Sequence, residues 1–436
     1  MRDRILGFIR IFTDFADRYK HILDPFCGVL LALIPLLQHY KGLIDNASTT
    51  LLALMVPYLV LRMLPQLLDF KISYLKPLGI LMLFFIYKLV DHGTYFGEIA
   101  QVSFMVIYFM AASLKVIDLK ALIKAATAVA VVGSIALFVQ SICYYGLGFH
   151  LQVVPDALLA KESYAWIAGI KTGLVGVNGV AGTLYRPAGI FLEPSHFFMY
   201  TFPVLFVNLF NTDKKKHSLI LPVIMTVGMF LSTSGMGMAV SLVVWSVFFV
   251  LWNVNEHDFK VQNFFRKRTA LFIGAILTLS VVAFIFVPTV RNAFLRIFVS
   301  GSSGSTAISG RVDGALFVLR KMTFVQNFIG KEDTTIFISY NMSGFMATMY
   351  KYGIIGIILS YEFYIKSLFK LDIARVLTSG LLLVVSLFSA HTHGTFFMIY
   401  YVMILMDGHN NNERSWICDS LLTLKTMSSK LVQKKA

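Results

Sequence analysis

Three side chains that can do chemistry lie close together in the segment RPAGIFLEPSHFF, residues 186–198: Arg186, Glu193 and His196. A carboxylate or an imidazole can take a proton from an attacking hydroxyl group, and a guanidinium group binds two phosphate oxygens at once. A charge at bilayer depth costs about 2.5–3.5 kcal/mol on insertion scales, so charged residues found there tend to be functional. The residues alone leave two interpretations open: an acid–base site that binds an anion, or a structural ion pair between Arg186 and Glu193.

Pro194 predicts that a helix begins inside this segment, because proline is favoured in the first turn, where its missing N–H is not needed. Ser195 and His196 then lie in that first turn, with Glu193 at its N-terminal edge. The free backbone N–H groups of a helix start can bind an anion. The segment therefore predicts a polar helix mouth directly before an apolar run.

A second set of cations flanks the helix-like stretch RVDGALFVLRKM, namely Arg311, Arg320 and Lys321. Guanidinium groups suit phosphate oxygens, which makes the set a candidate for binding a diphosphate. The residues alone favour the alternative, an amphipathic helix that grips lipid head groups.

Two further stretches contain polar residues within apolar sequence. STSGMG, residues 232–237, is either a helix break that exposes backbone donors or a set of small residues for close packing, and packing is favoured. His391 and His393 are a weak metal signal because no Asp, Glu or Cys lies near them in sequence, so we expect them to line a polar cavity and expect no metal. The three cysteines are scattered, and no disulfide is expected.

The elements that position these residues are membrane helices. Hydrophobic residues make up 57% of the 436 residues and charged residues 14%, whereas a soluble domain is about a quarter charged. Repeated apolar runs of about 20 residues predict bilayer-spanning helices. We expect an all-α polytopic protein, a single integral membrane domain over residues 1–436, with twelve spans at 22–39, 48–62, 74–90, 97–113, 123–145, 196–212, 218–232, 236–252, 269–287, 351–367, 373–390 and 394–408.

The basic residues orient this topology. With the N-terminus in the cytoplasm, 26 of the 38 Lys and Arg residues fall in inner segments and ten in outer ones, as membrane proteins prefer. Both termini are then cytoplasmic, and most of the excess behind the net charge of +15 faces the anionic lipid of the inner leaflet, so no nucleic-acid partner is expected. The first residues are expected to form a cytoplasmic or interfacial lead-in that is not cleaved.

Two outer segments, 146–195 and 288–350, are too long to be simple connections and are expected to be structured caps. No glycine-rich nucleotide loop and no cytosolic domain are evident in the sequence. Chemistry is therefore expected on the outer face.

The motifs resemble those of the Wzy-type polymerases of O-antigen and capsule repeat units. The box RPAGIFLEPSHF carries the resemblance, and LSTSGMG, SGRVDGALFVL, FIGKEDTT and NMSGFMATMYKYGIIGIILS follow in the order found in that family. The similarity covers residues 186–360 and the twelve-helix layout, with no motif in the N-terminal spans.

The resemblance implies a GT-C-like glycosyltransferase in the bacterial inner membrane, needing no cofactor. Its donor and acceptor are undecaprenyl-diphosphate-linked oligosaccharides, and the resemblance favours an inverting reaction, in which one displacement reverses the anomeric centre. The implied partners are membrane lipid, a chain-length regulator and a flippase. Either Glu193 or His196 is the expected base, and Arg186, Arg311, Arg320, Lys321, His391 and His393 are expected to bind the diphosphate or the sugars.

Two rival functions remain open. An O-antigen ligase shares the layout, but ligases usually have a histidine where this chain has Tyr340, just before Asn341. A lipid-oligosaccharide flippase predicts internal repeats, short loops and charges deep in the spans. The long asymmetric outer segments favour a polymerase over a flippase.

Overall fold

The computed structural model describes most of the predicted helices and parts of their connections. Besides the single positions 274, 278, 285 and 291, the described residues are 2–43, 46–68, 96–159, 174–176, 183–191, 193–210, 219–252, 316–331, 342–368, 373–387 and 395–406.

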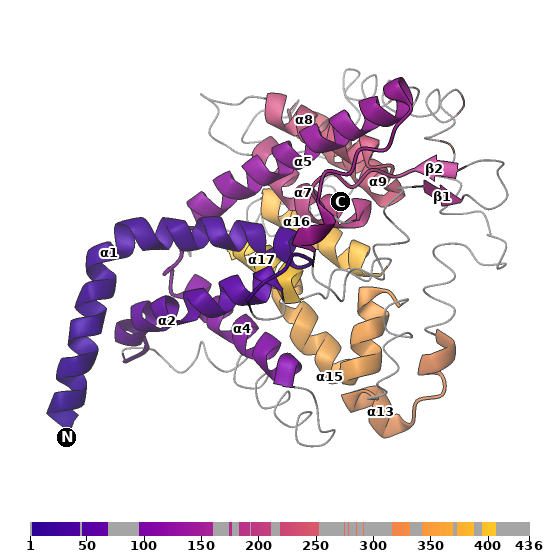
Figure 1. The fold of residues 1–436 in the computed structure, drawn as a ribbon. Coiled ribbons are helices and arrows are strands. Elements are labelled where there is room, and N and C mark those ends of the chain that lie inside the picture. The colour runs from indigo at the N-terminus through magenta and orange to yellow at the C-terminus, as the bar shows by residue number, and fades with distance from the viewer. Residues whose placement is uncertain are drawn as a thin grey trace, which may run out of the picture.

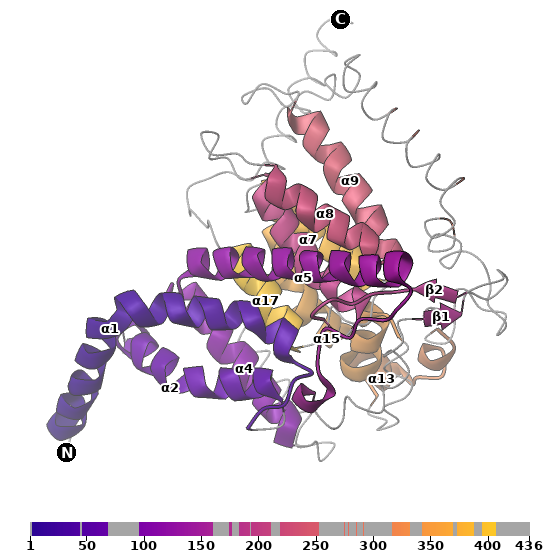
Figure 2. The same cartoon turned by 45° about the horizontal axis from the view of Figure 1, so that its top comes forward.

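This part of the chain is mainly helical (Figures 1 and 2). Its helices and strands are α1 (Arg2–Leu37), α2 (Ala47–Leu68), α4 (Phe96–Ser113), α5 (Leu119–Leu147), η2 (Asp156–Leu158), β1 (Leu174–Gly176), β2 (Thr183–Tyr185), α7 (Pro194–Leu209), α8 (Ile220–Leu231), α9 (Gly235–Trp252), α13 (Phe324–Ile329), α15 (Gly344–Ser367), α16 (Ile373–Ser386) and α17 (Thr395–Met406).

The helical prediction is confirmed where it can be compared with the structure. Each predicted span overlaps a described helix except 74–90, which lies outside the described residues, and 269–287, which lies there apart from single positions. The all-α expectation requires one addition, because β1 and β2 form a short antiparallel pair with Val175 opposite Leu184. The pair lies within the predicted outer segment 146–195.

Within the part of the chain that the structure describes, three helical stretches are long and apolar enough to cross a membrane: Ala16–Leu37, Ala47–Leu64 and Leu119–Leu147. Shorter apolar helices occur in α4, α8, α9, α16 and α17. The chain is therefore a helical, membrane-associated protein.

Helix α7 forms part of the core, and every residue in it except Ser195, Val207 and Asn208 is buried. It contacts α1, α5, α8, α9, α16 and α17, which surround it in both views (Figures 1 and 2). A helix that is hydrophobic all round is expected to be buried in this way. The predicted polar mouth therefore opens onto a core helix.

Tyrosine hydroxyl groups connect the core helices by donating to backbone carbonyl groups. Tyr200 donates to the oxygen of Ala32 at 2.7 Å, and Tyr400 donates to the oxygen of Tyr200 at 3.0 Å. Tyr401 donates to the oxygen of Met199 at 3.1 Å. Hydrogen bonds between helices of this kind contribute to packing in apolar surroundings, at about 0.6–2 kcal/mol each.

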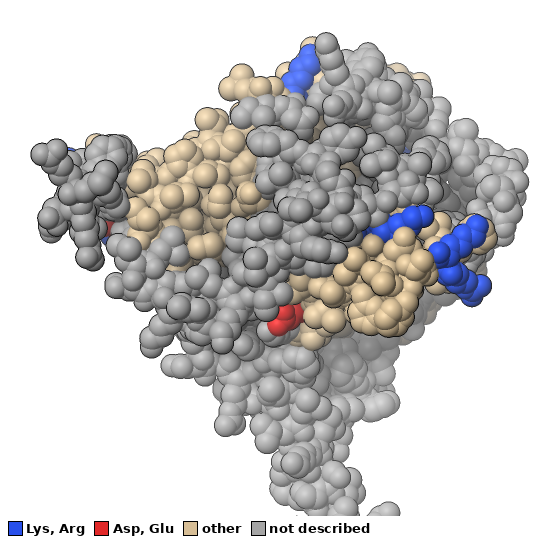
Figure 3. Space-filling model, turned by 90° about the horizontal axis from the view of Figure 1, so that it is seen from below, with Lys and Arg blue, Asp and Glu red and all other residues tan. Residues whose placement is uncertain are grey.

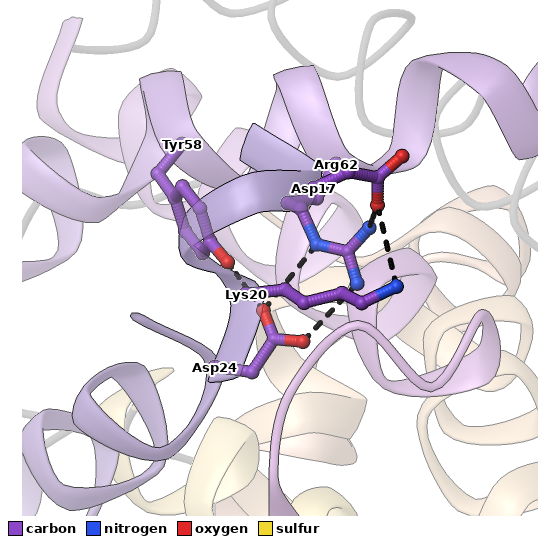
Figure 4. A network of polar contacts seen from close by, with 5 residues as sticks. All are labelled: Asp17, Lys20, Asp24, Tyr58 and Arg62. Atoms are coloured by element: carbon purple, nitrogen blue, oxygen red, sulfur yellow. Dashed lines mark hydrogen bonds and ion pairs between the residues drawn. The ribbon is translucent and has the colours of Figure 1, made fainter. Parts of the chain in front are cut away.

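A charged network joins α1 to α2 (Figure 4). Arg62 donates from Nη1 to Asp17 at 2.8 Å and from Nη2 to Asp24 at 3.1 Å. Tyr58 also donates its hydroxyl to Asp24, and Lys20 lies 3.8 Å from Asp17. The Arg62 side chain is only 12% exposed and Asp24 18%, whereas Asp17 and Lys20 are more than half exposed. The inner members of this network therefore fasten the first two helices together.

Candidate active site

Residues 185–196 run from the end of β2 to the first turn of α7. Arg186 follows β2 and is partly buried, and a turn at Ala188–Phe191 is closed by the Phe191 N–H, which donates to the Ala188 oxygen at 3.0 Å. Glu193 precedes α7 with extended backbone angles, φ −130° and ψ 142°, and Pro194 is the first helical residue. The predicted helix start at Pro194 is confirmed.

Glu193 caps α7 with its backbone rather than with its side chain. Its carbonyl oxygen accepts from the N–H groups of His196 at 3.1 Å and Phe197 at 3.2 Å. Its carboxylate makes no side-chain cap bond and accepts a hydrogen bond from the Ser195 hydroxyl instead. Glu193 and Ser195 are both partly exposed, so the carboxylate lies at the start of the helix with the Ser195 hydroxyl as a donor.

His196 lies just inside this mouth and is 3% exposed. Its ring stacks on that of His39, with the ring centroids 5.1 Å apart and the planes 10° from parallel. On another side it meets Phe397 of α17, with the centroids 5.8 Å apart. Helices α7 and α17 and the residues after α1 therefore meet at His196.

The sequence interpretation did not include His39. This residue follows the C-terminal end of α1, and nothing in its neighbourhood in sequence suggests a partner. The next residue, Tyr40, donates its hydroxyl to the Ile190 oxygen at 2.8 Å. Burial raises the pKa of Tyr40 to about 12, so the hydroxyl keeps its proton at neutral pH and remains a donor.

Gln140 of α5 holds the segment 185–196 through a side-chain hydrogen bond to its backbone. Its side-chain oxygen accepts from the Gly189 N–H at 2.8 Å, and its side-chain nitrogen donates to the Leu151 oxygen at 2.9 Å. Gly189 has φ +64°, and a Cβ there would lie 3.0 Å from the Gly133 oxygen. A side chain at position 189 is therefore strained by the backbone conformation and crowded by the Gly133 carbonyl.

The stretch STSGMG forms the connection between α8 and α9. Ser232, Thr233 and Ser234 are all buried, and Thr233 takes the left-handed conformation with φ +51°. The Thr233 hydroxyl donates to the Tyr185 oxygen at 3.2 Å. A Cβ at Gly237 would come within 3.5 Å of the Phe198 ring of α7. The stretch is therefore a buried helix break that also packs closely, directly beside residue 185.

An aromatic cluster surrounds Tyr185, the residue directly before Arg186. Tyr185 stacks on Tyr144 with the ring centroids 4.0 Å apart, and His150 and Tyr145 also contact Tyr185. Burial, followed by the influence of Tyr145, raises the pKa of Tyr185 to about 12. Tyr145 and His150 are exposed, so the end of α5 presents aromatic rings next to the candidate site.

The structure thus brings Glu193 and His196 together at the mouth of α7, with Arg186 on the strand side of the same segment. Arg320 and Lys321 lie just before α13, where both are exposed and Lys321 lies over the ring of Phe317, its Nζ atom 4.1 Å from the ring centroid. Arg311, His391 and His393 lie outside the described residues. Among the described residues, no three His, Cys, Asp or Glu side chains gather as a metal site would.

Comparison with protein-family models, with curated proteins and with solved structures finds no significant match. The fold and the site themselves define the class, a helical membrane-associated protein with an ordered polar segment at the mouth of a buried helix.

Proposed function

We propose that this protein is a glycosyltransferase that polymerises undecaprenyl-diphosphate-linked oligosaccharide repeat units of an O-antigen or a capsule, on the outer face of a bacterial inner membrane. The observation that carries the proposal is the geometry of the EPSH segment. Glu193 and His196 both lie at the start of buried α7, where a lipid held in the bilayer would present its diphosphate.

In the proposed reaction, a sugar hydroxyl of the acceptor repeat attacks the anomeric carbon of the growing chain. The new glycosidic C–O bond forms as the C–O bond to the diphosphate breaks, and undecaprenyl diphosphate leaves with the bonding electrons. A single displacement of this kind inverts the anomeric centre. The reaction needs a base for the hydroxyl proton and positive charge beside the departing diphosphate.

Glu193 is the base in this proposal. Its carboxylate is partly exposed and held by Ser195, which suits a group that must touch a substrate. His196 is buried between His39 and Phe397, which suits a group that fixes the start of α7. Arg186 supplies positive charge to the diphosphate, and Arg311, His391 and His393 remain predicted substrate-binding residues.

The proposal includes a twelve-span, GT-C-like topology with both termini in the cytoplasm. Contacts between helix ends support it. Tyr40 meets Ile190 and Thr233 meets Tyr185 at one end of the helices, whereas the Asp118 N–H donates to the Asp24 oxygen at the other end, 3.3 Å away. These pairings agree with the alternating directions that the predicted topology requires.

Reconstitution of the purified chain with a defined lipid-linked repeat tests the proposal. A ladder of longer lipid-linked products, with release of undecaprenyl diphosphate, is expected. In cells, deletion of the gene is expected to leave surface glycan of a single repeat. Absence of any glycan on the lipid A–core would indicate a ligase instead, and repeats trapped inside the cell would indicate a flippase.

A further inference from the structure

Residues 316–328 present several large apolar side chains to the outside of the protein. Phe317 is 61% exposed, Phe324 77% and Phe328 41%. Helix α13 has no buried residue, although a Thr323–Gln326 capping box defines its start. Single exposed apolar residues are ordinary, but a group of them marks an interaction surface.

Basic side chains accompany these rings. Arg320 and Lys321 are exposed immediately before α13, and Lys351 is exposed on α15. Lys321 extends over the Phe317 ring, with its Nζ atom 4.1 Å from the ring centroid. In the space-filling view of this side of the molecule, Lys and Arg side chains border a largely uncharged surface (Figure 3). We call this set the α13 surface: Phe317, Arg320, Lys321, Phe324, Phe328 and Lys351.

The α13 surface is fixed to α15 by close contact of two backbones. A Cβ at Gly330 would lie 2.1 Å from the Lys351 oxygen, and a Cβ at Gly353 would lie 2.3 Å from the Phe328 carbonyl. Both glycines have positive φ, and the Lys331 N–H donates to the Tyr350 oxygen at 2.7 Å. The exposed rings therefore belong to a packed unit.

The same contact places the α13 surface beside an apolar stripe of α15. Ile354, Ile358 and Ile365 are 38%, 58% and 48% exposed. Their spacing of four and then seven residues puts all three on one face of the helix. This stripe begins next to Gly353, where the Phe328 backbone lies, so the exposed isoleucines of α15 start beside α13.

We propose that the α13 surface lies in the membrane interface and binds the anionic head groups of bilayer phospholipids. Apolar rings flanked by Lys and Arg are the composition of an element that lies in the interface plane. The rings enter the acyl boundary, and the basic groups reach the phosphates. The positive charge favours an anionic lipid surface over a neutral one. This inference is independent of the proposed polymerase activity and gives Arg320 and Lys321 a role outside the reaction.

Depth-dependent quenching in the full-length protein tests the proposal. Cys418 is replaced by serine, while Cys27 and Cys143 are buried. Phe324→Cys then carries an environment-sensitive fluorophore, and the protein is reconstituted in phosphatidylcholine vesicles with or without phosphatidylglycerol. We expect blue-shifted emission, quenching by lipids spin-labelled near the head group, and stronger quenching with phosphatidylglycerol. Ile358→Cys is the matched control, for which quenching by lipids labelled deep in the acyl chain is expected.

Neutralising the three cations by Arg320→Gln, Lys321→Gln and Lys351→Gln is expected to abolish the phosphatidylglycerol effect. Lys41→Gln changes an exposed lysine elsewhere and is expected to leave it intact. Water-like emission from position 324 without quenching would overturn the proposal. A shielded fluorophore that no lipid label quenches would overturn it in favour of a protein partner, and a response only to added undecaprenyl diphosphate would return these cations to the substrate.

Discussion

Glu193 occupies a position where a carboxylate is not needed for the helix itself. Side chains at helix starts usually accept a backbone N–H, but that of Glu193 accepts the Ser195 hydroxyl and stays partly exposed. The helix start is instead defined by Pro194 and the Glu193 carbonyl. The cap of α7 therefore does not depend on the charge of Glu193.

Glu193→Gln is expected to abolish polymerisation while leaving the protein folded in the membrane. The amide keeps the size of the side chain and an acceptor for Ser195, but it is not a base. Loss of a general base typically lowers a rate by about 10²–10⁴-fold. The measurement is the product ladder from a defined lipid-linked repeat, with Glu362→Gln, a partly buried glutamate of α15, as control. Normal ladders from Glu193→Gln would make the carboxylate structural.

His39 gives a second test at this scale, because its stacking on His196 predicts a positioning role. His39→Ala is expected to lower the rate by up to about 10²-fold, since small misplacements of a reacting group are costly. His39→Phe keeps a flat ring and is expected to restore most of the rate with the same pH profile. If the phenylalanine variant is as slow as the alanine variant, His39 contributes its proton chemistry rather than its shape. His21→Ala, at an exposed site near the middle of α1, is the control.

Individual elements were easier to predict than their contacts. The start of α7 follows from a local rule about proline, and α8 and α9 match two predicted spans, although close packing rather than a helix break was favoured for the STSGMG stretch between them. The Tyr40–Ile190 bond joins positions 150 residues apart, and the Gln140–Gly189 bond joins positions 49 apart. No local sequence pattern marks Tyr40 or Gln140. Each side chain reaches its hydrogen-bond partner only because α1 and α5 pack around α7.

Gln140 tests whether α5 holds the candidate segment in place. Gln140→Leu keeps a similar volume but leaves the buried Gly189 N–H and the Leu151 oxygen without this partner. An unsatisfied buried group costs about 1–3 kcal/mol, so we expect lower thermal stability in detergent together with a slower reaction. Gln152→Leu, on the exposed chain after α5, is expected to change neither. Equal melting temperatures for both variants would show that the Gln140 hydrogen bonds contribute nothing to the stability of the protein.

The network between α1 and α2 tests the first helical pair. Arg62→Ala leaves Asp24 mostly buried beside Tyr58 without its cation. Breaking a fully buried ion pair costs about 3–5 kcal/mol, and this partly buried pair is expected to cost a fraction of that, enough to lower the yield of folded protein. Lys20→Ala removes the exposed partner of Asp17 and is expected to cost less than about 1 kcal/mol. Similar folded yields for the two variants would contradict the conclusion that the Arg62–Asp24 pair stabilises the fold more than the Lys20–Asp17 pair.

At the scale of the whole molecule, the sequence predicted an orientation as well as a fold. That orientation rests on the distribution of Lys and Arg, and it stays a prediction. The structure nevertheless links distant chain segments to the candidate site. Lys41 donates its N–H to the Leu158 oxygen at 2.8 Å, and Tyr40 binds Ile190. The connection between α1 and α2 therefore lies on the same side as Glu193, in agreement with the predicted alternation of the spans.

Thiol labelling at two positions tests on which side of the membrane the candidate site lies. Leu43 is 90% exposed in the connection between α1 and α2, and Lys120 is exposed at the start of α5, next to Asp118, which meets Asp24. With Cys418 replaced by serine, Leu43→Cys is expected to react with a membrane-impermeant thiol reagent in intact spheroplasts. Lys120→Cys is expected to react only after permeabilisation. The opposite pattern would place Glu193 in the cytoplasm, and the proposed outer-face polymerisation would then lose its site.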